Sequence, residues 1–172
     1  MDNNTIRLAG IVNDSVTDGP GIRYALFVQG CPHTCTGCHN PNSLSFSGGY
    51  LRDVSSIFNE IKSNPLLTGV TFTGGEPFGQ PAPLALLANK IKTIQLEIAI
   101  YTGYKYEELE ALGNDAKALI ALADIIVDGP FEIKRRSLDL RFKGSANQRV
   151  INVCQTILNN NVPVMDTSGR WE

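Results

Sequence analysis

The sequence lacks a long hydrophobic run, a strong charge of either sign and more than a few cysteines. No apolar stretch approaches the roughly 20 residues that a membrane-spanning helix needs, so no membrane contact is expected. A formal net charge of −2 argues against a general nucleic-acid binder. Residues 1–10 lack the apolar central region of a secretory signal peptide, so we expect a cytoplasmic protein, in which thiols stay reduced.

The composition is typical of a globular protein. Hydrophobic residues make up 42% of the chain and charged residues 19%, and 172 residues are enough for a sizeable core. No internal repeat or low-complexity segment divides the sequence. We therefore expect a single domain over residues 1–172.

Apolar runs alternate with amphipathic segments, which predicts an α/β fold with a mostly parallel sheet. Strands are expected at 23–29, 69–73, 96–101, 124–127, 148–153 and 162–165. Helices are expected from an Asp53 cap to Asn64, at 82–94, from about 107 to 123 with a break at Gly113, and at 154–160. Residues 1–22 are mixed and polar, and 131–143 is either a short helix or a surface loop.

Three of the four cysteines stand within eight residues, as C-x3-C-x2-C at Cys31, Cys35 and Cys38. A cubane 4Fe–4S cluster needs four ligands, so three cysteines would leave one iron open. An open coordination position is typical of a catalytic centre rather than a structural one. The alternative is zinc with His33 or His39 as the fourth ligand, although zinc sites favour C-x2-C pairs separated by a longer gap.

The fourth cysteine, Cys154, stands among apolar residues. The neighbours Val150, Ile151, Val153 and Ile157 predict a small core residue, which is the usual place of a free cysteine. We assign it no role in the site.

Four glycine-rich or polar stretches each follow the end of a predicted strand: the cysteine loop, 74–77, 102–104 and 128–129. Parallel sheets and barrels bind ligands at the carboxyl ends of their strands, so these stretches predict one active site. The glycines of Gly-Gly-Glu-Pro at 74–77 allow close approach of a ligand, and its glutamate suits a cationic amine; the alternative is an ordinary turn.

A basic run lies further along the chain. Its members are Lys134, Arg135, Arg136, Arg141 and Lys143. The run is either a solvated face or a docking surface for an acidic protein.

Together these motifs resemble a known superfamily. The three cysteines followed by Gly-Gly-Glu-Pro are similar to radical S-adenosylmethionine enzymes. Asp-Gly-Pro-Gly-Ile-Arg at 18–23 resembles the glycyl-radical-enzyme activases within that superfamily. The segments 101–104, 127–131 and 144–149 resemble the subgroup that activates anaerobic ribonucleoside-triphosphate reductase.

The resemblance implies that Cys31, Cys35 and Cys38 ligate a 4Fe–4S cluster whose open iron is chelated by S-adenosylmethionine. One electron would split this compound into methionine and a 5′-deoxyadenosyl radical. The radical would take a hydrogen from one glycine on the large subunit of anaerobic ribonucleoside-triphosphate reductase. A one-electron reductant such as flavodoxin or ferredoxin would be the second partner.

The resemblance also places residues around the cofactor. Gly74, Gly75 and Glu76 would lie along the methionine moiety, Gly37, Cys38 and His39 beside the adenosyl group, and Asp18 and Gly19 where the partner's glycine loop enters. Many superfamily members have an aromatic residue where this chain has glycine before the third cysteine, so the residue that stacks on adenine is unassigned. The chain is shorter than an eight-unit barrel, and an incomplete, splayed β/α barrel open toward the partner is expected.

Two alternative functions stay open at this point. One is an activase of another glycyl-radical enzyme, such as pyruvate formate-lyase. The other is a zinc-stabilised interaction module with no enzymatic activity.

Overall fold

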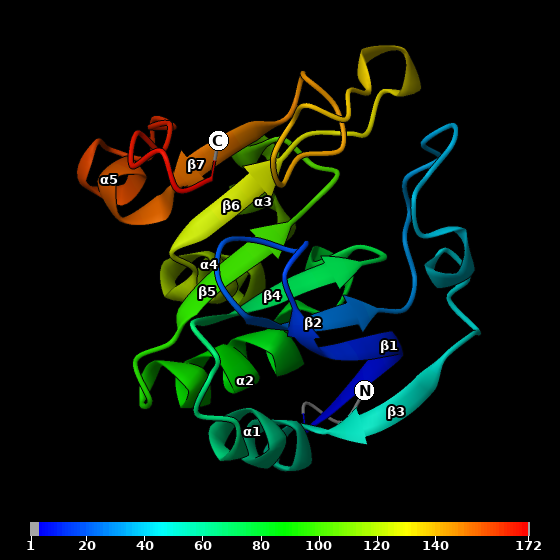
Figure 1. Cartoon of the computed structure of the whole chain (residues 1–172), viewed down its shortest axis with the longest axis vertical. Helices are drawn as coiled ribbons and strands as arrows, with labels where there is room; N and C mark the ends of the chain where they lie inside the picture. The colour runs from blue at the N-terminus through cyan, green and yellow to red at the C-terminus, as the bar shows by residue number, and fades with distance from the viewer. Residues whose placement is uncertain (1–3, 172) are drawn as a thin grey trace.

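The computed structural model describes residues 4–171, so residues 1–3 and 172 of the expected domain lie outside the described residues. Within the described range, seven strands form one sheet in the order β3-β1-β2-β4-β5-β6-β7 (Figure 1). The strands are β1 Thr5–Ser15, β2 Arg23–Val28, β3 Tyr50–Asp53, β4 Gly69–Gly74, β5 Glu97–Tyr101, β6 Ile125–Asp128 and β7 Arg149–Asn152. The α-helices are α1 Val54–Ser63, α2 Pro81–Lys92, α3 Tyr106–Leu109, α4 Asn114–Leu122 and α5 Val153–Leu158. Short 3-10 helices are η1 Pro41–Ser43, η2 Pro77–Gly79, η3 Glu110–Leu112 and η4 Ile133–Arg135.

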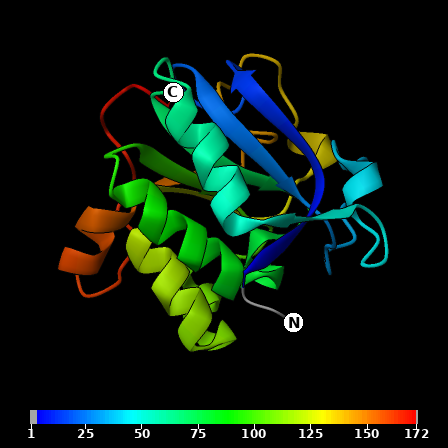
Figure 2. The same cartoon turned by 90° about the horizontal axis from the view of Figure 1, so that it is seen from below.

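The centre of the sheet is parallel and follows chain order. Strands β2, β4, β5 and β6 pair parallel to one another, as predicted. Successive right-handed crossovers in one direction place their helices on one face of a sheet. Figure 2 shows α1, α2 and α4 side by side along that face. Within residues 4–171, these three helices lie on one face, and the opposite face is partly covered by other parts of the chain.

The main core fills the space between the sheet and these helices. Leu26, Phe72 and Ile100, one from each of three central strands, have no exposed surface. The Asp53 carboxylate accepts a hydrogen bond of 2.8 Å from the Ser56 amide and caps α1, as predicted. The helices from 54 to 122 and the break at Gly113 are likewise confirmed to within a few residues.

Two predictions about the sheet are wrong. Strands β1 and β3 lie in segments where no strand was expected, and both pair antiparallel. The strand predicted at 148–153 is confirmed as β7, and it runs antiparallel to β6 because residues 129–148 return to the sheet from the same end as a loop rather than through a crossover helix. The expected strand at 162–165 is reduced to an isolated bridge between Ile151 and Met165.

A smaller apolar cluster covers part of the opposite face. It joins Ala99, Ile125, Val127 and Val150 to Trp171 near the C-terminus, with Tyr101 and Phe142 packed against them. The C-terminal segment therefore closes the β5–β7 side of this face and leaves its centre open.

Cys154 is exposed, so the prediction that it belongs to the core is wrong. It lies on α5, whose buried residues are Val153 and Thr156. The neighbours that suggested burial divide between β7 and α5, so their apolar character says nothing about position 154. None of the helices in the described part of the chain is long and apolar enough to cross a membrane.

Candidate active site

A cleft of about 390 Å³ opens at the carboxyl ends of the parallel strands. Its walls come from the loops that follow β2, β4, β5 and β6, together with residues 140–148. The four stretches that were predicted to meet at one edge therefore do meet. Phe27, Phe131 and Phe142 line the cleft with apolar surface, and Asp18 and Lys143 contribute one acidic and one basic side chain to its lining.

The three cysteines of the loop after β2 all line this cleft. Cys31, Cys35 and Cys38 are free thiols of intermediate exposure. The pKa of the Cys31 thiol is raised to about 11, mainly by burial; the His33 main chain lowers it through a hydrogen bond, and Glu76 and the other two cysteines raise it. Metal binding requires thiolates, so a cationic centre would have to offset this cost of deprotonation.

The cysteine loop is compatible with a cluster, in which the sulfurs need not meet at one ion. Zinc holds each sulfur at about 2.3 Å, which brings tetrahedral sulfur ligands within about 4 Å of one another. Among residues 4–171, no three His, Cys, Asp or Glu side chains converge in a way that would hold one metal ion. In a cubane each cysteine binds a different iron, so such convergence is not required. An all-sulfur donor set suits iron–sulfur clusters, and it suits zinc as well.

The base of the cysteine loop is closed by main-chain hydrogen bonds. The Gly30 amide donates to the Ser43 carbonyl at 2.8 Å, and the Cys31 amide donates to the Leu44 carbonyl at 3.1 Å. At the tip, the Asn40 amide donates to the Cys38 sulfur at 3.4 Å. These contacts shape the loop without occupying the sulfur of Cys31 or Cys35.

Gly74 and Gly75 line the cleft, and their lack of side chains is also required by packing. Gly74 has φ +94°, and a Cβ there would lie 2.6 Å from the Phe27 Cα. A Cβ on Gly75 would lie 2.4 Å from the Gly30 carbonyl oxygen. The Gly75 and Glu76 amides donate to the carbonyls of Val28 and Gly30 at 2.8 and 2.9 Å. The turn after β4 is therefore pressed against the base of the cysteine loop.

Glu76 does not line the cleft, and its side chain has no exposed surface. One carboxylate oxygen accepts from the Phe78 amide at 3.0 Å and from the Thr102 hydroxyl at 2.9 Å. The other accepts from the Gly103 amide at 2.9 Å and contacts His33 Nε2 at 2.9 Å. A carboxylate offers about four acceptor positions, and all four are used within the protein. Glu76 thus ties the loops after β4 and β5 to the cysteine loop through His33.

Gly37 also lies outside the cleft lining, on the outer side of the cysteine loop. It has φ +73°, and a Cβ there would lie 2.6 Å from the Ile133 Cδ1 atom. Its neighbour His39 does line the cleft, with its ring centre 4.5 Å from that of Phe131. The segment around η4 therefore packs directly on the cysteine loop.

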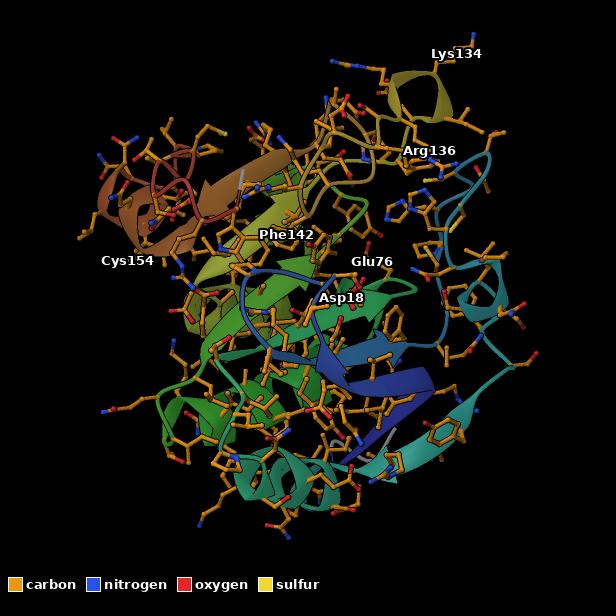
Figure 3. The ribbon with its side chains drawn as sticks, viewed as in Figure 1. Asp18, Glu76, Lys134, Arg136, Phe142 and Cys154 are labelled. Atoms are coloured by element: carbon orange, nitrogen blue, oxygen red, sulfur yellow. The ribbon has the colours of Figure 1, made fainter. Side chains whose placement is uncertain are left out.

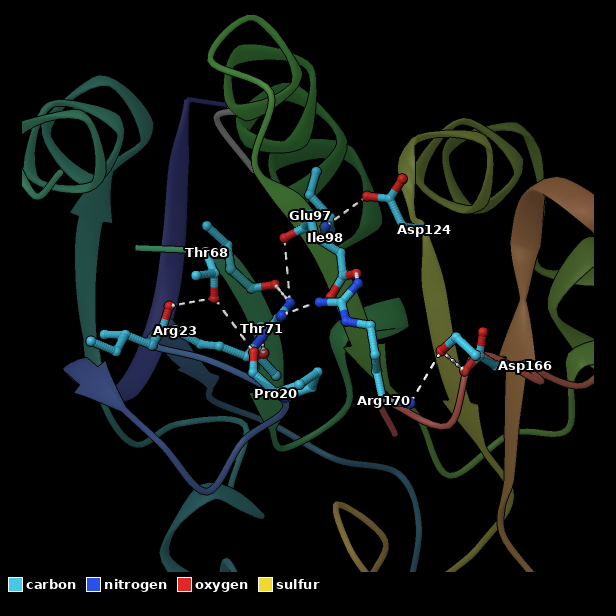
Figure 4. A network of polar contacts seen from close by, with 12 residues as sticks. Pro20, Arg23, Thr68, Thr71, Glu97, Ile98, Asp124, Asp166 and Arg170 are labelled. Atoms are coloured by element: carbon cyan, nitrogen blue, oxygen red, sulfur yellow. Dashed lines mark hydrogen bonds and ion pairs between the residues drawn. The ribbon is translucent and has the colours of Figure 1, made fainter. Parts of the chain in front are cut away.

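Asp18 lines the cleft, and its main chain is linked through Thr71 to the buried guanidinium of Arg23. Arg23 has no exposed surface and donates to the Thr71 hydroxyl at 2.7 Å and to Glu97 at 2.8 Å (Figure 4). Thr71 in turn donates to the Asp18 carbonyl at 2.7 Å. Burial lowers the pKa of Arg23 and Glu97 raises it again, while the Trp171 ring lies 5.3 Å from the guanidinium.

Asp128, at the end of β6, is structural. Its buried carboxylate accepts from the Tyr106 amide at 2.7 Å and pairs with Arg149, which also binds Glu107. Arg149 lowers the pKa of Glu107 to about 2. The ion pair anchors β7 against β6 beside the glycine turn at 129.

Several lining residues were not identified from the sequence. Phe27 faces the cleft from within an apolar strand, and the period of two along β2 is the signal that would have found it. Tyr101 and Phe142 are joined by a 2.8 Å hydrogen bond from the tyrosine hydroxyl to the Phe142 carbonyl. Burial raises the pKa of Tyr101, so this phenol stays protonated at neutral pH. Figure 3 shows Phe142 and Asp18 at the centre of this face, far from Cys154.

Known proteins resemble this chain over most of its length. The sequence profile of the 4Fe-4S single cluster domain family matches residues 17–151. An anaerobic ribonucleoside-triphosphate reductase-activating protein of Haemophilus influenzae is 35% identical over 142 residues, which cover 77% of this chain and 89% of that protein. The protein of the same name from Pasteurella multocida is 34% identical over 149 residues, covering 81% and 93%. The crystal structure of QueE from Escherichia coli matches with a TM-score of 0.47 and 14% identity over 58% of this chain and 53% of that one, which is too distant to decide the fold.

Proposed function

Because the chain belongs to the family of anaerobic ribonucleoside-triphosphate reductase-activating proteins, we propose that it generates a glycyl radical on the large subunit of that reductase. When bound, a 4Fe–4S cluster would supply the electron that splits S-adenosylmethionine into methionine and a 5′-deoxyadenosyl radical, which takes a hydrogen from a glycine Cα. The observation that carries the proposal is that three cysteines of one loop line the same cleft as Gly74 and Gly75.

The proposed roles of the residues follow from their places in this cleft. Cys31, Cys35 and Cys38 would each hold one iron and leave the fourth to S-adenosylmethionine. Gly74 and Gly75 would lie along its methionine moiety, because main chain without side chains lines the cleft there.

Other residues of the proposal lie beside the adenosyl group or support the cysteine loop. Cys38 and His39 would flank the adenosyl group from the cleft wall, with Gly37 shaping the loop behind them. Glu76 would contribute by holding the cysteine loop in place through His33, because its carboxylate is already bonded within the protein.

The apolar walls have a role in the same proposal. Phe27, Phe131 and Phe142 would exclude water from a reactive radical once the partner covers the cleft. Asp18, at the mouth, would meet the glycine loop of the reductase, with Gly19 beside it. The sheet would be an incomplete β/α barrel whose open side the reductase closes.

The remaining parts of the proposal concern the cellular setting. A single activase domain would act in the cytoplasm, where its thiols stay reduced. A flavodoxin or a ferredoxin would supply the electron. Neither statement is needed for the chemistry of the cleft.

The test is to reconstitute the protein anaerobically with iron and sulfide and to combine it with S-adenosylmethionine, dithionite and the large reductase subunit. We expect a glycyl radical by electron paramagnetic resonance and one methionine for each radical formed. Parallel incubation with pyruvate formate-lyase identifies the partner, since a radical on that enzyme alone would support the rival activase. Bound zinc without iron or sulfide would support an interaction module instead.

Variants of the cysteines give the matched control. Replacing Cys31, Cys35 or Cys38 by alanine should abolish cleavage of S-adenosylmethionine, because each is one of only three proposed ligands. Cys154→Ala removes an exposed thiol outside the cleft and should leave cleavage intact. Equal loss in all four variants would contradict the ligand assignment.

A further inference from the structure

Positive charge is concentrated in one segment of an otherwise acidic protein. Residues 132–143, here called the basic segment, hold five of the 15 lysines and arginines and two of the 17 acidic residues. The segment therefore carries a formal charge of +3, and the rest of the chain carries −5. Such a separation produces a local positive field on a protein whose net charge is negative.

The basic side chains project into solvent rather than bonding within the protein. The exposed side chains of Lys134, Arg136 and Arg141 have no hydrogen bond or ion pair within the described residues, and the Arg135 side chain has only a 3.7 Å pair with Glu132. Figure 3 places Lys134 at the outer tip of the molecule, with Arg136 nearer the cysteine loop. A cationic side chain that stabilises a fold is usually paired with an anion. The stability of the fold therefore does not explain these unpaired lysine and arginine side chains.

An apolar side chain stands among these charges. Leu138 is 89% exposed, the largest exposed fraction among the large hydrophobic residues of the described chain. A protruding leucine within a cationic segment suits a protein interface, because the charges steer the encounter and the apolar group is buried on contact.

The first part of the basic segment packs on the cysteine loop, whereas Leu140, Phe142 and Lys143 near its end line the cleft. Ile133, within η4, packs where a Cβ on Gly37 would lie, between Cys35 and Cys38. Directly before the segment, the ring of Phe131 contacts that of His39. A protein seated on η4 would therefore approach the cysteines through packed side chains, without entering the cleft.

We propose that the basic segment is the docking surface for an acidic one-electron carrier protein. This inference rests on the proposed function, because a cluster held by the three cysteines has to be reduced from outside. One electron leaves the reduced carrier and enters the cluster, and no bond forms or breaks. The reductase has a different requirement, since its glycine has to enter the cleft itself, where Asp18 stands.

The test compares two reductants on the reconstituted protein. The variant Lys134→Glu/Arg136→Glu reverses two exposed charges of the segment. The control Lys62→Glu/Lys117→Glu makes the same change in net charge at exposed positions on α1 and α4, on the helical face. Cluster reduction by a fully reduced flavodoxin is followed by stopped-flow absorbance at low and high ionic strength, and reduction by dithionite is measured in parallel.

We expect the first variant to slow reduction by flavodoxin about tenfold or more at low salt, because steering fields change association rates by about 10–10³. The loss should shrink as salt screens the charges. The control should stay within about twofold, and dithionite should reduce all three proteins equally. Equal flavodoxin rates in both variants would overturn the proposal.

Two other outcomes are separable. A loss of glycyl radical with dithionite as reductant, in the first variant alone, would mean that the reductase docks on this surface, and it would overturn the carrier assignment. Failure of the wild-type protein to form any radical with dithionite would instead contradict the proposed function.

Discussion

The carboxylate of Glu76 provides the sharpest test of how the site is built. If it fastens three loops together within the protein, its removal should destabilise the protein even when iron and S-adenosylmethionine are absent. If it serves only to bind a ligand, the ligand-free protein should not change. The substitution Glu76→Gln separates these cases, because glutamine has the same size and differs in one polar atom.

The magnitude follows from the four contacts. Each carboxylate oxygen accepts from one main-chain amide, Phe78 or Gly103, and contacts one side chain, Thr102 or His33. In glutamine one oxygen becomes an NH₂ group, which cannot accept. The side-chain partner at that position can turn to accept instead, but the main-chain N–H cannot. One buried donor is therefore left unpaired, at a cost of about 1–3 kcal/mol.

The assay is urea unfolding of the iron-free, reduced protein, followed by circular dichroism and by fluorescence of Trp171, the single tryptophan. With an m value of about 2 kcal/mol/M, the midpoint should fall by about 0.5–1.5 M. The control Glu110→Gln alters an exposed glutamate outside the site and should change stability by less than about 0.5 kcal/mol.

A double-mutant cycle extends the test to the cysteine loop. His33→Ala should destabilise the wild-type protein more than it destabilises Glu76→Gln, since the two residues share a contact. An unchanged midpoint for Glu76→Gln would refute the fastening role, and additive effects would show that His33 is not coupled to it.

Two further predictions follow from the same region. Burial raises the pKa of Cys31 to about 11, so its reactive thiolate forms only as the pH rises toward that value. In the folded, iron-free protein at pH 9, iodoacetamide should therefore label the exposed Cys154 well before Cys31. Peptide mass spectrometry gives the order of labelling, and earlier labelling of Cys31 would contradict the prediction. Gly75→Ala places a Cβ 2.4 Å from the Gly30 carbonyl oxygen and should destabilise the folded protein by about 1–3 kcal/mol. The control Gly79→Ala meets nothing within 4 Å and should leave stability unchanged. Equal melting temperatures of the two variants would disprove the packing argument.

The elements that the sequence predicted correctly are those specified by nearby residues. Helix α1 has a capping Asp53 and an apolar face, β2 is a nearly continuous apolar run, and β4 is rich in residues that favour strands; both strands are buried on both faces. Strand β1 escaped prediction because the register shifts between Leu8 and Gly10, which interrupts the alternation of apolar residues. A bulge of this kind depends on the partner strand, and local periodicity does not reveal it.

The site could be predicted to the extent that its residues adjoin strand ends. The cysteine loop follows β2, and Gly74 is the last residue of β4. Because β2 and β4 pair in parallel, their ends lie side by side and bring these residues together. Glu76 was expected to face a ligand, and its side chain instead points into contacts with the next loop. The sequence identifies which residue follows a strand, but it does not identify the neighbour that will occupy its acceptors.

The place of Asp18 illustrates the same limit at longer range. A buried guanidinium is tolerated only when its donors are satisfied, and Arg23 reaches this state through β4 and β5 together. Trp171, from the far end of the chain, then seals the guanidinium from water. Since Thr71 links this group to the Asp18 carbonyl, the turn at the cleft is positioned by contacts independent of the cysteine loop. Disturbing Arg23 should therefore displace the expected entry point of the partner while the three thiols keep their arrangement.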